Sequence, residues 1–123
     1  MTQPLALVFY ERLLPGSQLV NRLQDRGYRV QAVPVAPLLV IEAEKQKPLL
    51  VFADLESTKN EICAAIADLK KNPATAHLPV ICFCSEARKD LQAAALAVGA
   101  LTVGDAALLE HLSQLLDQAL QLD

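Results

Sequence analysis

Short apolar runs alternate along the chain with segments whose apolar residues recur at helical spacing. Residues 5–9 and 49–53 are apolar throughout, which is typical of strands buried on both faces of a parallel sheet. Residues 28–33 alternate between apolar and polar side chains and predict a half-buried or edge strand. Two further strands are predicted at residues 79–84 and 101–103.

Helices are predicted between and after these strands, at about residues 17–27, 37–46, 58–71, 85–99 and 105–120. Ser17 and Ser85 are candidate N-terminal caps of the first and fourth helices, and Thr58 begins a capping box. Gly27 and Gly99 are expected to close the same two helices in a left-handed conformation.

The alternation of strands and helices predicts an α/β fold. We expect a single domain over residues 1–123, in which five βα units build a doubly wound, parallel, five-stranded sheet with helices on both faces. The chain has 123 residues, of which 53% are hydrophobic, and this is sufficient for one such core.

Charge and hydropathy exclude several classes of partner. The net charge is -3 and the largest basic cluster is Lys70-Lys71, so the basic surface of a nucleic-acid-binding protein is missing. The longest apolar run, at residues 32–41, contains two prolines and is too short to span a membrane. No signal peptide opens the sequence, and three cysteines without C-x-x-C spacing suit a reducing compartment. We therefore expect a cytoplasmic protein.

Asp54 is the first candidate for a functional residue, because it directly follows the apolar strand at residues 49–53. In α/β proteins, functional groups gather where the parallel strands end.

Three stretches give the chain a family resemblance: P-L-L-V-F-A-D-L at residues 48–55, L-K-K-N-P-A-T-A-H-L-P-V-I at 69–81 and A-L-A-V-G-A at 95–100. They resemble, in turn, the third strand with its phospho-acceptor turn, the third helix through the fourth strand, and the end of the fourth helix of the response-regulator receiver domain. The spacings from Asp54 to Pro79 and to Gly99 also match that family. The resemblance implies the flavodoxin-like fold of the chemotaxis regulators, with strand order 2-1-3-4-5.

The same resemblance implies that most of the phosphorylation chemistry is missing. A receiver accepts phosphate from a histidine kinase on an aspartate, here Asp54, and uses Mg²⁺ held by an acidic pair after the first strand. Phe9 and Tyr10 stand where that acidic pair is expected, and Glu11 follows them. Neither aromatic side chain is a carboxylate, so the carboxylate oxygens that a hard cation needs are missing there.

Three more receiver positions also differ. Cys84 matches the hydroxyl residue that ends the fourth strand, and a thiol is a far weaker hydrogen-bond partner for a phosphoryl oxygen. On ungapped spacing, the lysine that pairs with the phosphoryl group falls at Ala106, and the aromatic switch residue falls at Val103. The chain therefore looks like a degenerate pseudo-receiver.

Several interpretations stay open at this stage. Asp54 is either a strand-end carboxylate without chemistry, or still a modified or cation-binding residue helped by Glu11 and Glu56. Phe9 and Tyr10 either fill the emptied pocket or present a small hydrophobic docking point.

The last predicted helix suggests a contact surface. Most of its leucines are expected to face the sheet, whereas Leu109, Leu116 and Leu120 extend the apolar stripe beyond it. Together with Val103 they belong to the face of the fourth helix, fifth strand and fifth helix, which the resemblance makes the partner surface.

Three hypotheses follow. The first is a stand-alone pseudo-receiver, without catalysis, metal or other cofactor, that binds a histidine kinase or another signalling protein independently of phosphorylation; a homodimer is also open. The second is a divergent phosphorelay receiver that accepts phosphate on Asp54 and uses Mg²⁺. The third, a small enzyme on a flavodoxin-like sheet, is disfavoured because the chain has only four glycines and lacks a Gly-rich phosphate loop.

Overall fold

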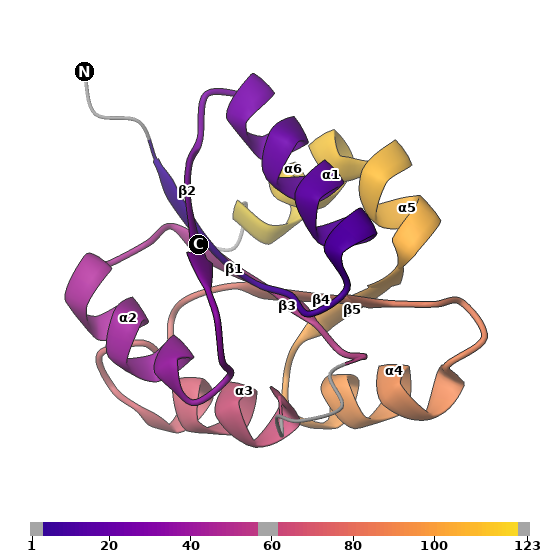
Figure 1. The fold of residues 1–123 in the computed structure, drawn as a ribbon. Helices are drawn as coiled ribbons and strands as arrows, with labels where there is room; N and C mark the ends of the chain where they lie inside the picture. The colour runs from indigo at the N-terminus through magenta and orange to yellow at the C-terminus, as the bar shows by residue number, and fades with distance from the viewer. Residues whose placement is uncertain (1–3, 57–61, 121–123) are drawn as a thin grey trace.

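The computed structural model describes residues 4–56 and 62–120 of the chain. Five parallel strands form one sheet with the order β2-β1-β3-β4-β5 (Figure 1). The strands are β1 (Leu5–Phe9), β2 (Arg29–Val33), β3 (Leu50–Asp54), β4 (Val80–Cys84) and β5 (Leu101–Gly104). The predicted parallel sheet and its strand order are confirmed.

Helices cover both faces of the sheet (Figure 1). One layer contains α1 (Leu13–Asp25), α5 (Asp105–Glu110) and α6 (Leu112–Leu120). The other contains α2 (Leu38–Gln46), α3 (Ile62–Lys71) and α4 (Lys89–Ala97). Among the described residues, no helix is both long enough and apolar enough to cross a membrane.

The core has two halves because successive side chains of a strand point to opposite faces. In β1, Leu7 and Phe9 pack toward α2, α3 and α4, whereas Ala6 and Val8 pack toward α1, α5 and α6. The three central strands are buried on both faces, and β2 lies at the edge with its first residue, Arg29, exposed. The uninterrupted apolar runs of the sequence thus correspond to the central strands.

Both predicted serine caps are wrong. α1 begins at Leu13, and Pro15 lies in its first turn, where a helix does not require the missing N–H. The hydroxyl of Ser17 therefore lies inside the helix and donates to the carbonyl of Leu14 at 3.3 Å. Ser85 precedes α4 by a short turn and accepts a hydrogen bond from the N–H of Ala87 at 3.3 Å.

The predicted helix over residues 105–120 consists of two helices. α5 ends before His111, whose ψ of 27° departs from the helical value, and α6 then begins at Leu112. Leu108 before the break and Leu112 after it are both buried against the sheet. Gly27 and Gly99 close α1 and α4 with positive φ, as predicted, whereas the capping box at Thr58 lies outside the described residues.

Candidate functional site: a guanidinium among three carboxylates

Asp54 is the last residue of β3, and its side chain is 0% exposed. An ionised carboxylate without water must be satisfied by protein donors, because burying an unpaired charge is costly. Its Oδ2 accepts hydrogen bonds from the backbone N–H groups of Glu11 at 3.2 Å and Arg12 at 3.0 Å. Its Oδ1 accepts one from the N–H of Glu56 at 3.0 Å. Asp54 thus ties the segment after β1 to the segment after β3.

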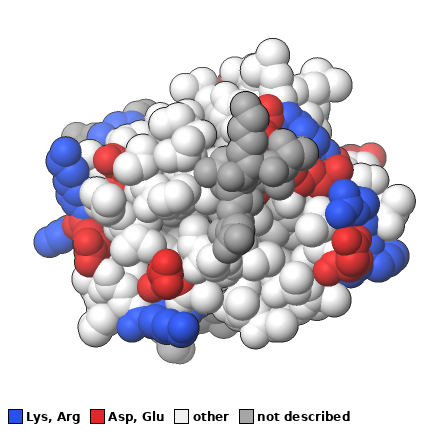
Figure 2. Space-filling view, turned by 60° about the horizontal axis from the view of Figure 1, so that its bottom comes forward, with Lys and Arg blue, Asp and Glu red and all other residues white. Residues whose placement is uncertain are grey.

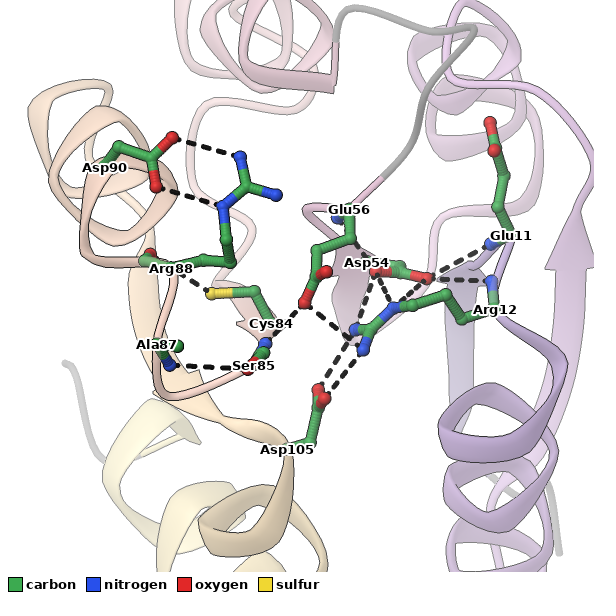
Figure 3. Close-up of polar contacts among 10 residues, drawn as sticks. All are labelled: Glu11, Arg12, Asp54, Glu56, Cys84, Ser85, Ala87, Arg88, Asp90 and Asp105. Atoms are coloured by element: carbon green, nitrogen blue, oxygen red, sulfur yellow. Dashed lines mark hydrogen bonds and ion pairs between the residues drawn. The ribbon is translucent and has the colours of Figure 1, made fainter.

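Arg12, the residue directly before α1, places its guanidinium between Asp54 and Asp105 (Figure 3). Its Nη2 and Nε lie 2.9 and 3.1 Å from Oδ1 of Asp54. Its Nη1 and Nη2 donate to the two carboxylate oxygens of Asp105 at 2.7 and 3.0 Å. Each carboxylate therefore binds two nitrogens of one planar fork, a geometry that arginine offers and lysine does not.

Glu56 brings a third carboxylate to the same guanidinium. Its Oε2 lies 3.3 Å from Nη1 of Arg12 and accepts the backbone N–H of Ser85 at 2.5 Å. The hydrogen bond to Ser85 connects the segment after β3 to the end of β4. Of the three carboxylates of this pocket, Asp54 lies in β3, Glu56 in the loop after it and Asp105 at the start of α5.

The pocket keeps Arg12 charged. Burial by itself lowers the pKa of Arg12, but hydrogen bonds to Asp105 and Asp54 and the charges of both carboxylates outweigh it, so the pKa of Arg12 is raised. The guanidinium also lies over the ring of Phe83, with Cζ 5.9 Å from the ring centroid, which adds a cation–π contact. Three carboxylates thus surround one permanent cation.

The residues do not fit a divalent metal ion. Mg²⁺ requires several oxygen ligands that converge on one point, and both oxygens of Asp54 are already engaged by N–H donors. In the part of the chain that the structure describes, no three His, Cys, Asp or Glu side chains are placed to hold a metal together. The positive charge of the pocket comes from Arg12.

The fold of the chain, unlike its sequence, matches known proteins. No protein-family model matches the sequence, and no curated protein matches it either. A putative response regulator from Chloroflexus aurantiacus is similar in structure, with a TM-score of 0.88 at 15% identity over 98% of this chain and 99% of that one. The chain has the receiver fold.

Two further receiver domains support this assignment. One is the receiver domain of the sensor histidine kinase PA1611 from Pseudomonas aeruginosa, which was solved with a magnesium ion coordinated in its active-site cleft. It has a TM-score of 0.86 at 16% identity, over 98% of this chain and 99% of that chain. That of NtrX from Brucella abortus has a TM-score of 0.83 at 19% identity, over 96% and 99%. At these identities the similarity concerns the fold alone.

Phe9 and Tyr10, at the positions where a receiver is expected to hold its metal, serve packing. Phe9 is 0% exposed and belongs to the core between the sheet and the α2, α3, α4 layer. Tyr10 is half-buried beside α1, where a Cβ on Gly16 would lie 2.0 Å from its ring. Glu11 contributes its backbone N–H to Asp54, whereas its side chain is exposed and points away from the pocket (Figure 3).

Cys84 ends β4, as the resemblance expects of the receiver hydroxyl position, and is 0% exposed. Burial raises the pKa of its thiol, and the Sγ lies 3.8 Å from the carbonyl oxygen of Arg88, to which it donates. The S–H group of Cys84 thus makes its weak hydrogen bond within the loop after β4.

Ala106, the position of the family's lysine on ungapped spacing, does not reach the pocket. β5 ends at Gly104, so the first residue beyond the strand is Asp105, whose carboxylate binds Arg12, while Ala106 is exposed on α5. The side chain that reaches the pocket from the start of α5 is thus a carboxylate, and Ala106, where ungapped spacing puts the family's lysine, is its neighbour in the chain.

The predicted partner face is partly covered. Leu116 is only 5% exposed, so its predicted exposure is wrong: α6 packs on the sheet and turns this residue into the core. Val103 and Leu109 are half-buried, and the side chain of Leu120 lies outside the described part. Leu96 of α4, a helix that packs beside β5, is 60% exposed.

Arg12 and Asp105 are the site residues that sequence reasoning missed. One signal existed for each: Arg12 is a cation close behind the first strand, and Asp105 follows the last predicted strand as Asp54 follows the third. Neither signal says that the two residues meet.

Proposed function

We propose that this chain is a receiver-fold interaction module that binds a signalling protein without phosphorylation of Asp54 and without catalysis. One observation carries the proposal: the carboxylate of Asp54, fully buried, is neutralised by Arg12 at 2.9 Å.

Phosphoryl transfer to Asp54 requires a carboxylate oxygen that is free to attack. Both carboxylate oxygens of Asp54 accept hydrogen bonds from N–H groups. Arg12 would therefore have to release one of these oxygens before it could attack a phosphoryl group. The product would also replace the single negative charge of Asp54 by the up to two charges of an acyl phosphate, in a pocket that already contains Glu56 and Asp105. The energetic cost of phosphorylating Asp54 therefore favours a module that functions only in its unphosphorylated state.

The surface proposed for the partner is the face of α4, β5 and α5. Leu96 is its exposed apolar residue, and Val103 and Leu109 are half-buried beside it. Exposed apolar side chains at the surface of a soluble domain mark candidate contact sites. The partner class is a histidine kinase or another signalling protein, and a second copy of the chain is an alternative occupant.

The test of phosphorylation independence uses beryllofluoride with Mg²⁺, a mimic of aspartyl phosphate. Thermal melts of the wild type and of Asp54→Asn are compared with and without it, since a ligand that binds only the folded state raises the melting temperature. We expect no rise for either protein. A rise for the wild type alone supports the second candidate function, a divergent receiver that accepts phosphate on Asp54 with Mg²⁺.

That second candidate is favoured by one observation: Asp54 keeps the strand-end position, with Glu56 half-buried next to it. It also predicts that acetyl phosphate adds a mass of one phosphoryl group to the wild type.

The partner face is tested by affinity capture with the variant Leu96→Glu and the matched control Ile41→Glu. The two residues are similarly exposed, at 60% for Leu96 and 55% for Ile41, but they lie on different helices. We expect a partner that is captured by the wild type and by Ile41→Glu to be lost from Leu96→Glu. Loss from both variants, or from neither, contradicts the proposed face.

A further inference from the structure

We propose that Asp54, Glu56 and Asp105 form a guanidinium-binding site, which Arg12 fills from within the same chain at the place where the receiver resemblance implies a metal ion. This inference deepens the proposed function and rests on it for the absence of a phosphoryl group at Asp54. We call these three carboxylates and the ring of Phe83 the guanidinium site.

The shape of the site favours a planar fork over a point charge. Nε and Nη2 of Arg12 face Asp54, while Nη1 and Nη2 face Asp105 (Figure 3). Each of two edges of one guanidinium is thus hydrogen-bonded to one carboxylate. A metal ion needs ligands that converge on one centre, and no such group of three exists among the described His, Cys, Asp and Glu side chains.

The carboxylates on the β3 side are held in place by bonds that do not involve the guanidinium. Asp54 accepts the backbone N–H groups of Glu11, Arg12 and Glu56, and Glu56 itself accepts the N–H of Ser85. Phe83 is buried in the sheet beneath the guanidinium. Because these contacts do not involve the side chain of Arg12, we expect Arg12→Ala to keep the backbone frame around Asp54 and Glu56.

The bound guanidinium joins parts of the fold that belong to different elements. Arg12 precedes α1, Asp54 ends β3, and Asp105 begins α5. Since α5 is part of the proposed partner face, Arg12 fixes that face to the end of the sheet without any modification of Asp54. Figure 2 shows charged side chains mainly along the rim of the face that it draws, with mostly uncharged atoms between them.

The decisive experiment restores a guanidinium to a chain that lacks one. Arg12→Ala is melted with and without methylguanidinium, beside the wild type and the control Arg88→Ala, which removes a guanidinium from the exposed pair with Asp90. We expect a rise of about 5 °C for Arg12→Ala at about ten times the dissociation constant, and no rise for the other two proteins. Mg²⁺ in place of methylguanidinium should leave Arg12→Ala unchanged.

Equal responses of Arg12→Ala and the wild type overturn the proposal, as does stabilisation of Arg12→Ala by Mg²⁺ and not by methylguanidinium. If Arg12→Ala does not fold, the wild type itself gives the answer by NMR: the Nε–H of Arg12 should exchange at least about tenfold more slowly than that of Arg88, and its signal should shift in Asp105→Asn. Equal exchange of the two Nε–H groups overturns the proposal.

The two tests fail in different ways. Beryllofluoride binding to the wild type counts against the proposed function and is measured without any change at Arg12. Absence of methylguanidinium rescue counts against the guanidinium site alone, because it leaves the state of Asp54 in the wild type as it was.

Discussion

Arg12 and Asp105 meet at 2.7 Å although 93 positions separate them in the chain. The same guanidinium lies 2.9 Å from Asp54, so one side chain closes a bridge between two carboxylates that would otherwise repel each other. The stability of this end of the sheet should therefore depend on each member of the bridge.

Asp54→Ala is expected to destabilise the protein by about 3 to 5 kcal/mol, because it removes one partner of a buried ion pair and leaves three backbone N–H groups without their acceptor. Urea denaturation measures the free energy of unfolding. The control is Asp90→Ala, which breaks the exposed pair with Arg88 and should cost less than about 1 kcal/mol. Similar losses in the two variants would show that Arg12 contributes nothing through Asp54.

Two threonines should respond in opposite ways to replacement by valine. Thr75 is 0% exposed and donates to the carbonyl of Leu69 at 2.7 Å, so Thr75→Val should lower the free energy of unfolding by about 1 to 3 kcal/mol. The Oγ1 of Thr102 is buried and has no hydrogen-bond partner among the described residues. Thr102→Val should therefore raise the free energy of unfolding by about 1 kcal/mol. Equal signs for the two changes would contradict this assignment.

Gly16→Ala should destabilise the protein by about 1 to 3 kcal/mol, because the added Cβ lies 2.0 Å from the ring of Tyr10. In a double variant with Tyr10→Ala, the cost of Gly16→Ala should largely disappear. Gly27→Ala is the comparison: its Cβ meets nothing within 4 Å, so only the positive φ of 87° costs stability, and Tyr10→Ala should not change that cost.

Alkaline pH should destabilise the folded chain through its cysteines. Burial raises the pKa of Cys63 and Cys82, so the native state keeps these protons where the unfolded chain, with a thiol pKa near 9.0, releases them. The contribution of these two thiols to the free energy of unfolding should be constant below pH 8 to 9. It should fall as the pH rises further, by about 1.4 kcal/mol per pH unit for each fully retained proton. Urea titrations across this range, repeated with Cys82→Ala, measure the slope, which should be smaller in the variant.

Most of the fold could be predicted from the sequence because hydrophobic periodicity reports burial directly. Residues 5–9 are apolar without a break and form β1 with the predicted bounds. Prediction failed where a local signal had two structural meanings. Pro15 and Gly16 suggest a break before a helix, yet proline is equally compatible with a first turn, and α1 starts earlier at Leu13.

The site was predictable only as far as local position determines it. Asp54 could be assigned because it directly follows a buried strand. Its bond to Arg12 spans 42 positions, and no periodicity or motif connects two such residues. Ungapped spacing pointed to Ala106, which is exposed on α5, and not to its neighbour Asp105, which binds Arg12.

The covalent tether of Arg12 has a consequence for how the pocket responds to its surroundings. A metal ion reaches its site at whatever concentration the solution provides and leaves when a chelator removes it. A side chain that is part of the same polypeptide has an effective concentration fixed by the fold, typically in the millimolar range or above. The positive charge that Arg12 itself places at the end of this sheet therefore does not vary with divalent-ion supply, and it is set when the chain folds.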